Sequence, residues 1–279
     1  LLDALPADIK VSVFDNIPEN PTIAGVEGAL AVYQENNCNG IIGLGGGSVL
    51  DSGKALRVAT NLDLSVIEIL NDLSKVTADV APYITIPTTA GTGAEITFGG
   101  GIHPETNAPA MTIRSIHVQP DLAICDPDFT MTLPPRLTAA TGMDALTHCV
   151  EGFLSKNANP PAEAIALDGT RRVIDYIHRA VDDGSDREAR LNMSMAALQG
   201  GMAIYMGLGP IHALSMCFGD SPLHHGTLVT VAMPAVMRFF NGKLADSVLE
   251  RYAEAMNLAG DKDAGNRIAD AVAEMNAKL

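Results

Sequence analysis

The chain has 279 residues, of which 47% are hydrophobic and 18% are charged, and this is enough apolar material to bury one large core or two smaller ones. Its formal net charge of −15 at pH 7 repels phosphate backbones and anionic lipid surfaces, so we expect neither nucleic acid nor a membrane as a partner. No uninterrupted apolar run approaches the roughly 20 residues that a membrane-spanning helix needs.

The first half of the sequence alternates short β-rich runs with helical patterns. In chain order it predicts a strand at 10–14, a helix at 23–36, a strand at 40–44, a helix at 49–60, and strands at 83–87 and 122–125. Two further runs, 95–102 and 110–116, could pair as a hairpin. Strands that alternate with helices form mainly parallel sheets with helices on their faces, so this half predicts an α/β domain.

The second half reads as helical throughout. A turn-rich stretch at 126–135 leads into helical patterns at 136–154, 161–182 and 187–206. We therefore expect an α/β domain over residues 1–130 and an all-helical domain over 131–279. Because the chain begins with Leu1 rather than Met and stops inside the helical pattern 266–279, we expect that the first strand of the α/β domain and part of the C-terminus lie outside it.

The four cysteines are far apart in the sequence and form neither a CxxC pair nor a dense disulfide framework; they are Cys38, Cys125, Cys149 and Cys217. This usage predicts a reducing compartment, and we expect a cytoplasmic protein.

A glycine-rich turn joins a buried-type strand to a helix in Gly40-Ile-Ile-Gly-Leu-Gly-Gly-Gly-Ser48. Backbone amides are exposed at such a helix N-terminus, and a dinucleotide pyrophosphate can approach them without meeting a Cβ atom. The turn is not a Walker loop, because Ala55 follows Lys54, nor a full Rossmann fingerprint, because Ser48 stands where a third glycine would be. A structural tight turn explains it equally well when it is considered alone.

A second polar cluster, Pro87-Thr-Thr-Ala-Gly-Thr-Gly-Ala-Glu-Ile-Thr97, follows the strand predicted at 83–87. Hydroxyls and glycines just beyond the carboxyl end of a strand lie where open α/β sheets bind ligands. The alternative is a loop whose hydroxyls only cap its own backbone.

Four side chains are candidates for one metal site. Asp144 and His148 are four residues apart in a helical pattern, so both lie on one helix face. His212 and His225 sit in apolar, glycine-bearing surroundings that offer a lone imidazole no obvious polar partner. Singly, each could be a salt-bridged or core residue; together they favour a shared ion. Carboxylate and imidazole ligands suit Fe²⁺ or Zn²⁺.

These motifs, in this order, resemble the iron-containing alcohol dehydrogenase family, part of the dehydroquinate-synthase-like superfamily. The matching segments span nearly the whole chain: Gly45-Gly-Gly-Ser-Val-Leu-Asp51 with Lys54-Ala55, Pro87-Thr-Thr-Ala-Gly-Thr-Gly-Ala-Glu95, Leu133-Pro-Pro135 through Thr141-Gly-Met-Asp-Ala-Leu-Thr-His148, and His212-Ala-Leu with His225-Gly226.

The resemblance implies a metal-dependent oxidoreductase that transfers hydride between an alcohol and NAD or NADP, with one divalent metal, Fe²⁺ first and Zn²⁺ second, acting as a Lewis acid on the substrate oxygen. We also expect a homodimer or higher homo-oligomer. The implied metal ligands, through which the chemistry runs, are Asp144, His148, His212 and His225. The residues implied near the pyrophosphate and nicotinamide are Gly46, Gly47, Ser48 and Asp51, and those lining the cofactor cleft are Thr88, Thr89 and Thr92.

The sequence departs from the family pattern in places. Met216 stands where the family usually carries a further histidine, one helical turn after His212, and a lysine often present near the predicted hairpin is absent. The interval from His212 to His225 is also one residue shorter than is common, which leaves His224 as an alternative ligand, although the following Gly226 favours His225.

Two other readings of function stay open at this stage. A glycerol-dehydrogenase-like or dehydroquinate-synthase-like enzyme would share the cofactor turn and differ in substrate. A non-catalytic dinucleotide-binding relative would hold the cofactor without turning it over, and Met216 keeps that reading open.

Overall fold

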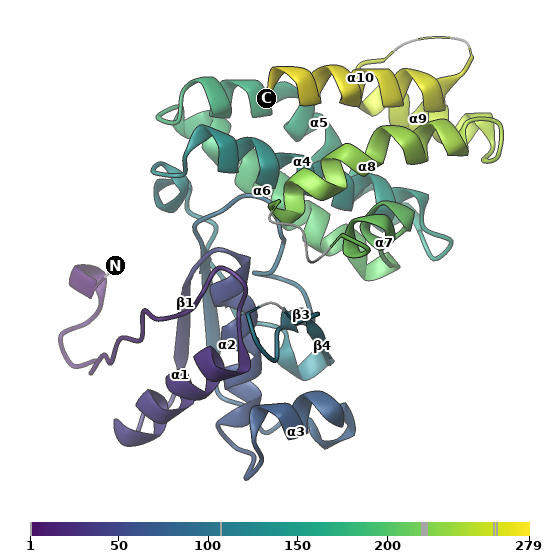
Figure 1. Cartoon of the computed structure of the whole chain (residues 1–279). Helices are drawn as coiled ribbons and strands as arrows, with labels where there is room; N and C mark the ends of the chain where they lie inside the picture. Colours follow the sequence, from purple (N-terminus) through teal and green to yellow (C-terminus); the bar gives the residue numbers. More distant parts are fainter. Residues whose placement is uncertain (1, 107, 219–222, 259, 261) are drawn as a thin grey trace. The chain divides into compact units, whose positions relative to one another are not determined.

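The structure, a computed structural model, describes residues 2–106, 108–218, 223–258, 260 and 262–279. The chain forms two compact units (Figure 1). The first contains Leu1–Gly43, Ser48–Ile84 and Phe98–Leu122, and the second contains Leu44–Gly47, Thr85–Thr97 and Ala123–Leu279. Two short segments from the first half of the sequence therefore belong to the same unit as the helical second half.

A three-stranded parallel sheet runs through the first half of the sequence. Its strands are β1 (Ile41–Gly45), β2 (Tyr83–Pro87) and β5 (Leu122–Ala123), in the order β1-β2-β5. The amide of Ile41 donates to the Pro82 carbonyl on one side of β2, and the amide of Ile124 donates to the Thr85 carbonyl on the other. A parallel strand with partners on both sides is buried on both faces, and β2 is accordingly mostly apolar, with Thr85 buried at its centre. The predicted parallel sheet is confirmed.

Three helices lie in this half: α1 (Ile23–Glu35), α2 (Gly47–Ala59) and α3 (Val66–Asn71). Thr22 is the N-cap of α1: its hydroxyl accepts a 3.2 Å hydrogen bond from the Gly25 amide and so satisfies one free donor of the first turn. α3 follows Ser65, whose amide donates to the Glu68 carboxylate at 2.9 Å. The sequence predicted α1 and α2 but not α3, because six residues are too few to establish a helical period.

The predicted hairpin is also present. β3 (Gly99–Ile102) and β4 (Met111–Arg114) pair antiparallel, with Gly99 opposite Arg114. The hairpin is tied to α2 within the first unit, because Lys54 donates to the Gly99 carbonyl at 2.7 Å.

The prediction of a strand at residues 10–14 is wrong. Residues 10–14 have no regular secondary structure, and the side chains of Val11 and Val13 are exposed. Alternating apolar residues favour a strand only where a neighbouring strand supplies hydrogen bonds and a covered face, and these residues have neither in the structure.

Seven helices form most of the second unit: α4 (Pro135–Leu154), α5 (Pro160–Asp182), α6 (Arg187–Ala203), α7 (Pro210–Met216), α8 (His225–Phe240), α9 (Asp246–Ala255) and α10 (Ala264–Lys278). Proline occupies the first turn of α4 and α5, where its missing amide costs nothing. The prediction that the second half of the chain is helical is confirmed. Among the residues that the structure describes, no helix is both long and apolar enough to cross a membrane.

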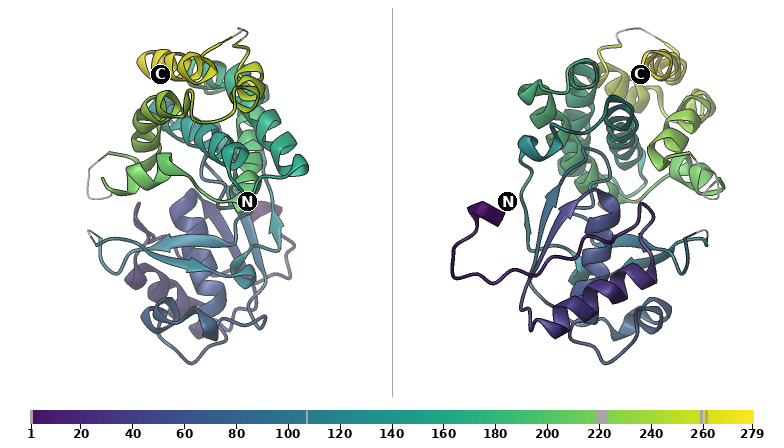
Figure 2. Two further views of the ribbon diagram at one scale, coloured as in Figure 1. Left: turned by 90° about the vertical axis from the view of Figure 1, so that its right-hand side faces the viewer. Right: turned by 60° about the vertical axis from the view of Figure 1, so that its left-hand side comes forward.

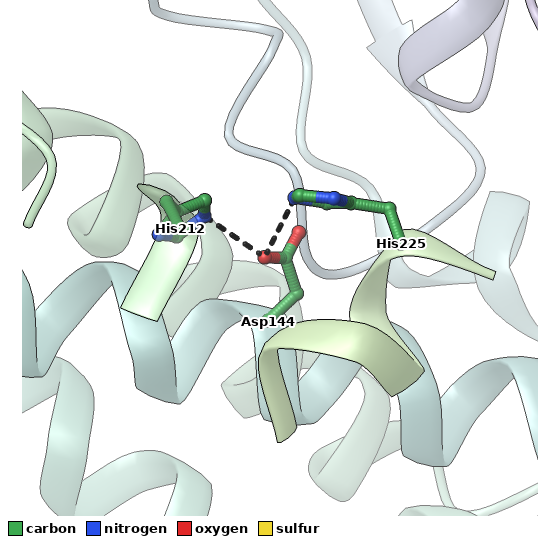
Figure 3. Close-up of side chains that lie close together, drawn as sticks. All are labelled: Asp144, His212 and His225. Carbon is green, nitrogen blue, oxygen red and sulfur yellow. Dashed lines mark ion pairs between the residues drawn. The ribbon is translucent and has the colours of Figure 1, made fainter. Parts of the chain in front are cut away.

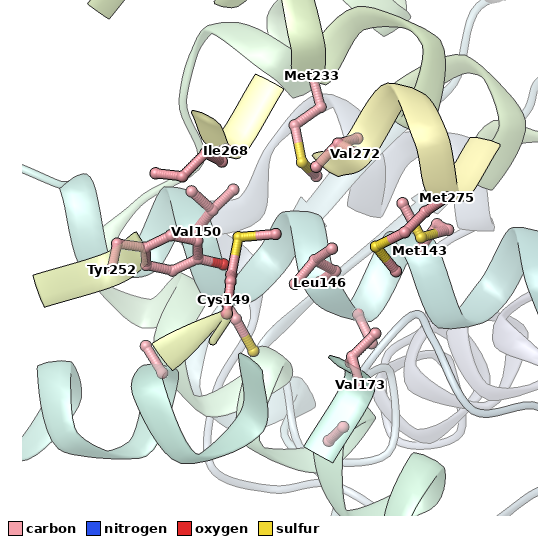
Figure 4. Packing of buried hydrophobic residues seen from close by; sticks show 14 of the residues in the cluster. Met143, Leu146, Cys149, Val150, Val173, Met233, Tyr252, Ile268, Val272 and Met275 are labelled. Atoms are coloured by element: carbon pink, nitrogen blue, oxygen red, sulfur yellow. The ribbon is translucent and has the colours of Figure 1, made fainter. Parts of the chain in front are cut away.

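Helix α4 is the centre of this unit. It packs against α5, α6 and α8, and every residue from Thr138 to Phe153 is buried. Figure 4 shows Leu146 and Val150 of α4 surrounded by apolar side chains of several other helices. Figure 2 shows α8, in green, lying beside the yellow α10, and these two helices are in contact. A polar side chain on α4 is therefore held on a rigid, dry support.

Candidate metal centre

Helix α4 carries two of the four predicted ligands. Asp144 and His148 are one turn apart, and only 2% and 5% of their surfaces are exposed. Asp144 Oδ1 lies 3.6 Å from His148 Nε2. The other ring nitrogen of His148, Nδ1, lies 3.2 Å from the Gly91 carbonyl oxygen. Because a carbonyl can only accept, Nδ1 carries the proton and Nε2 turns its lone pair toward Asp144.

Helix α7 brings His212 to the same carboxylate. The helix starts with Pro210, so His212 lies in its first turn, where it is 4% exposed. Its Nε2 is 3.6 Å from Asp144 Oδ1. The His212 ring stacks on that of His148, with 4.8 Å between centroids and 8° between planes.

His225 approaches from a third helix. It is the first residue of α8, and its Nε2 lies 3.9 Å from Asp144 Oδ1. The following Gly226 allows this approach, because a Cβ atom there would lie 2.2 Å from the Ala140 carbonyl oxygen of α4. His224 has a different role: it is the N-cap of α8, and its Nδ1 accepts a 3.1 Å hydrogen bond from the Gly226 amide.

The geometry fits a metal ion. Asp144 Oδ1 and His212 Nε2 are buried and have no hydrogen-bond partner in the described part of the chain, although buried polar atoms nearly always have one. Asp144, His212 and His225 each offer one ligand atom, and these atoms lie within 4.8 Å of one another. Figure 3 shows both imidazoles turned toward the Asp144 carboxylate. His148 lies outside this set of three, but its Nε2 faces the same Asp144 oxygen.

The pKa shifts reflect one buried carboxylate among three imidazoles. Burial alone would raise the pKa of Asp144, but the neighbouring His148, His225 and His212 outweigh it and hold the pKa below its ordinary value. Burial lowers the pKa of His148 to about 4 and also lowers that of His225, so both imidazoles are neutral at pH 7. Burial also opposes the charged form of His212, but the carboxylates of Asp144 and Glu151 prevail and raise its pKa to about 9.

Four of the predicted cofactor residues lie together in the second unit. A Cβ atom on Gly46 would lie 3.2 Å from the Thr89 methyl group, and one on Gly47 would lie 2.9 Å from the Thr92 methyl group. The Thr89 hydroxyl is buried without a hydrogen-bond partner among the described residues. The two glycines thus bring the turn close against the threonine loop, and the 13-residue helix α2 begins at Gly47. The N-terminus of such a helix can bind a phosphate, so the predicted cofactor site stays a prediction.

The other predicted cofactor residues use their polar groups differently. The Ser48 hydroxyl donates to the Glu19 carbonyl. The Asp51 carboxylate accepts from the Lys54 ammonium and from the Gly101 amide, both at 3.0 Å. The Thr88 amide donates to the Gly45 carbonyl beside β1. Ser48 and Asp51 therefore have protein partners within the first unit, and their contact with a cofactor stays a prediction.

Two residues of the site were missed by sequence reasoning. Gly91 contributes only its carbonyl oxygen, for which no side-chain signal exists. Glu151 is 4% exposed and bonds the His212 ring. It stands three residues after His148 in an apolar helical pattern, and a carboxylate in such a position needs a partner, so it could have been noticed.

Comparison with known proteins identifies the family. The family model described as "Iron-containing alcohol dehydrogenase" matches residues 1–127, and the model of the C-terminal domain of the Fe-containing alcohol dehydrogenase family matches residues 138–279. The chain is 42% identical over 290 residues to a 4-hydroxybutyrate dehydrogenase from Cupriavidus necator, covering 100% of this chain and 74% of that protein. It is also 39% identical over 233 residues to alcohol dehydrogenase 4 from Schizosaccharomyces pombe, covering 83% of this chain and 55% of that protein.

Comparison with solved structures points to the same family. A 1,3-propanediol oxidoreductase superposes with a TM-score of 0.88 at 32% identity, over 96% of this chain and 71% of that one. Sulfoacetaldehyde reductase from Bifidobacterium kashiwanohense, solved with NAD⁺, superposes with a TM-score of 0.89 at 28% identity, over 96% and 70%. The chain thus belongs to the iron-containing alcohol dehydrogenase family, a group of metal-dependent, nicotinamide-linked alcohol oxidoreductases, as its motifs predicted.

Proposed function

We propose that this chain interconverts a small alcohol and its aldehyde or ketone, with NAD or NADP as hydride partner and one divalent metal bound by Asp144, His148, His212 and His225. The observation that carries the proposal is the pair of buried, unpartnered atoms, Asp144 Oδ1 and His212 Nε2. Left without a cation, two such atoms cost free energy, whereas a shared Fe²⁺ or Zn²⁺ ion satisfies both.

When bound, the metal supplies Lewis-acid polarisation of the substrate oxygen. The protein supplies the rest. Asp144 contributes the negative charge that balances a divalent cation, and His148 contributes a neutral imidazole on a rigid helix. The His225 side chain is 49% exposed, whereas the other three side chains are 3 to 6% exposed. The site is therefore open beside His225 and closed elsewhere, and a catalytic metal needs such an open position for its substrate.

We assign the cofactor to the glycine turn and the threonine loop. Gly46 and Gly47 leave space for a pyrophosphate, and Thr88, Thr89 and Thr92 follow the carboxyl end of β2, where parallel sheets bind ligands. Ser48 and Asp51 complete the set. In this assignment residues 1–130 form the dinucleotide-binding domain and residues 131–279 the metal-binding and catalytic domain.

We also propose a cytoplasmic homodimer or higher homo-oligomer. All four cysteines are free thiols, as a reducing compartment requires.

Three of the relatives support a proposal for the substrate class. Their names contain 4-hydroxybutyrate, 1,3-propanediol and sulfoacetaldehyde, and each of these small molecules carries a second polar group besides the reacting one. We expect a short aliphatic alcohol of that kind.

The test is a turnover screen of the metal-loaded chain with NADH and NADPH against short aldehydes that do and do not carry a second polar group. Oxidation of either cofactor by one of them supports the proposal, and the preferred aldehyde gives the substrate class. A chain that binds Fe²⁺ or Zn²⁺ and NADH but reduces none of them is a binding protein, and the proposal fails.

A further inference from the structure

Glu151 is buried beside the metal centre and accepts hydrogen bonds from one short stretch of chain. Its Oε2 accepts from the Gly209 amide at 2.9 Å and bonds His212 Nδ1 at 2.6 Å. Its Oε1 accepts from the Ile211 amide at 2.6 Å, with the His212 amide at 3.4 Å. One carboxylate therefore holds both the start of α7 and the imidazole that α7 carries.

This arrangement decides which nitrogen of His212 faces the metal site. The Glu151 carboxylate accepts, so His212 Nδ1 must donate. In the neutral ring, which is the form that binds a metal, Nε2 then carries the lone pair and faces Asp144 Oδ1, 3.6 Å away. A hydrogen bond from the second ring nitrogen to a carboxylate fixes the ring, fixes the tautomer and makes the coordinating nitrogen a stronger donor.

Among the residues that the structure describes, neither of the other two imidazoles has such a carboxylate on its second ring nitrogen. His148 Nδ1 faces the neutral Gly91 carbonyl at 3.2 Å. His225 is half exposed at the open side of the site. His212 thus has the shortest and only charged orienting contact of the three among the described residues.

We propose that Glu151 is a positioning residue of the metal centre: by accepting the His212 Nδ1 proton, it sets the tautomer, orientation and donor strength of that ligand, and with them the affinity for the metal. The inference rests on the proposed function, because it assumes that His212 binds a metal through Nε2. Glu151 itself does not touch the metal or substrate in this scheme.

A purely structural role is the competing explanation, since a buried carboxylate at the start of α7 would also stabilise that helix. The substitution Glu151→Gln separates the two. In one orientation the glutamine side-chain oxygen faces the backbone amide of Ile211, and the side-chain NH₂ then faces His212 Nδ1. This favours the tautomer with its proton on Nε2, and a protonated Nε2 cannot bind the metal. In the reversed orientation the side-chain NH₂ faces the backbone amide of Ile211. Both groups are donors, so the hydrogen bond from Ile211 is lost.

The experiment measures the affinity of the full chain for Zn²⁺ by chelator competition, and the visible absorption spectrum of the Co²⁺-loaded chain, which reports ligand geometry. We expect Glu151→Gln to weaken Zn²⁺ binding by about 10- to 100-fold and to change the Co²⁺ spectrum. The matched control is Glu163→Gln, which removes an ion pair with Arg251 on α9 within the same unit and should leave both readouts unchanged.

Unchanged Zn²⁺ affinity and an unchanged Co²⁺ spectrum in a folded Glu151→Gln chain would overturn the inference while leaving the proposed function intact. If that variant does not fold, Glu151→Asp is measured instead: it keeps the charge but withdraws it from the ring, so we expect weaker Zn²⁺ binding, and wild-type affinity would overturn the inference. A wild-type chain that binds no metal would instead remove the proposed function.

Discussion

Gly93 and Gly201 meet backbone to backbone: a Cβ atom on Gly93 would lie 2.5 Å from the Gly201 Cα atom. Gly93 also has a φ of +63°, a conformation that other residues adopt at a cost. This contact seats the loop after β2 on helix α6. The same loop carries Gly91, whose carbonyl orients His148, so the contact between these two glycines helps to hold one of the proposed metal ligands.

We therefore expect Gly201→Ala to destabilise the chain and loosen the metal centre. The new methyl group would lie 2.7 Å from the Ile96 side chain and 2.9 Å from the Gly93 backbone, and overpacking of this kind costs about 1–3 kcal/mol. Urea unfolding measures the loss, and Zn²⁺ competition measures the effect on the site. Gly40→Ala is the control, because its nearest neighbour would be the Pro82 carbonyl oxygen at 3.8 Å. Equal stability of the two variants would contradict the role of this contact.

The second prediction separates His225 from its neighbour. His225→Ala should lose most of the bound metal, because it removes a ligand atom that lies 3.9 Å from Asp144 Oδ1. Asp144→Asn should do the same with almost no change in shape, because the neutral amide no longer balances a cation. Metal content after dialysis, measured by elemental analysis, gives the result.

His224→Ala is the matched control for this experiment. It removes the cap that accepts from the Gly226 amide, which should cost about 0.5–2 kcal/mol of stability but leave the metal bound. Stoichiometric metal in His225→Ala together with metal loss in His224→Ala would reverse the ligand assignment.

The third prediction concerns the glycine turn. Gly47→Val should weaken NADH binding strongly and leave the metal content unchanged, because a branched side chain fills the space that a pyrophosphate needs. The structure adds a complication: any side chain at Gly47 also meets the Thr92 methyl group at 2.9 Å. Fluorescence titration with NADH of Gly47→Ala, with and without Thr92→Ser, resolves it. The serine removes the methyl collision, so recovery of full affinity in the double variant would show that the glycine serves packing and not the cofactor.

Local patterns explain what the sequence could and could not foresee. The four-residue spacing of Asp144 and His148 fixes their common face as soon as α4 is a helix, so both could be placed in advance. The convergence of His212 and His225 on that face depends on helix packing. Their apolar, glycine-bearing surroundings favoured a shared ion, and the family resemblance implied the full ligand set. Glu151 was missed because its partners lie some 60 residues away, at Gly209, Ile211 and His212.

The error at residues 10–14 has a different cause. Alternation of apolar and polar residues indicates which side chains a strand would bury. It does not indicate whether a neighbouring strand is available to pair with it, because pairing depends on the whole sheet. Ser48 and Asp51 illustrate the same limit, because the sequence cannot reveal that Glu19 and Gly101 bind their side chains.

The fourth prediction is a pH dependence of thiol reactivity. Burial, together with the nearby Glu95, raises the pKa of Cys125 to about 12, and burial raises that of Cys149 to about 12. Since the thiolate is the reactive form and is only a minute fraction of a thiol whose pKa is about 12, both thiols should stay almost unlabelled between pH 7 and 9. Cys217 is exposed and should react with iodoacetamide throughout. Peptide mass spectrometry gives the labelled fraction; rapid labelling of Cys149 in folded protein at pH 8 would contradict this account.

The last prediction concerns Met216, at the end of α7. It lies one helical turn after His212, on the same side of the helix, and 72% of its surface is exposed. A thioether cannot titrate, so it relays no proton. Because the side chain is exposed and buries little apolar surface, Met216→His should change stability by less than about 0.5 kcal/mol and leave the metal bound. An imidazole there would ionise near its unperturbed pKa of about 6.5, being charged below that pH and neutral above it.

We therefore expect Met216→His to add an ionisation near pH 6.5 to the kcat/KM profile, or to shift substrate preference, while Met202→His, on the partly exposed end of α6, adds none. Wild-type activity should lack that step, because nothing at position 216 can lose a proton. The informative contrast is a broad aldehyde and ketone screen with metal and both cofactors. If the wild-type chain reduces nothing and Met216→His reduces something, the methionine is an inactivating substitution, and this member of the family is a dinucleotide-binding protein that has lost its chemistry.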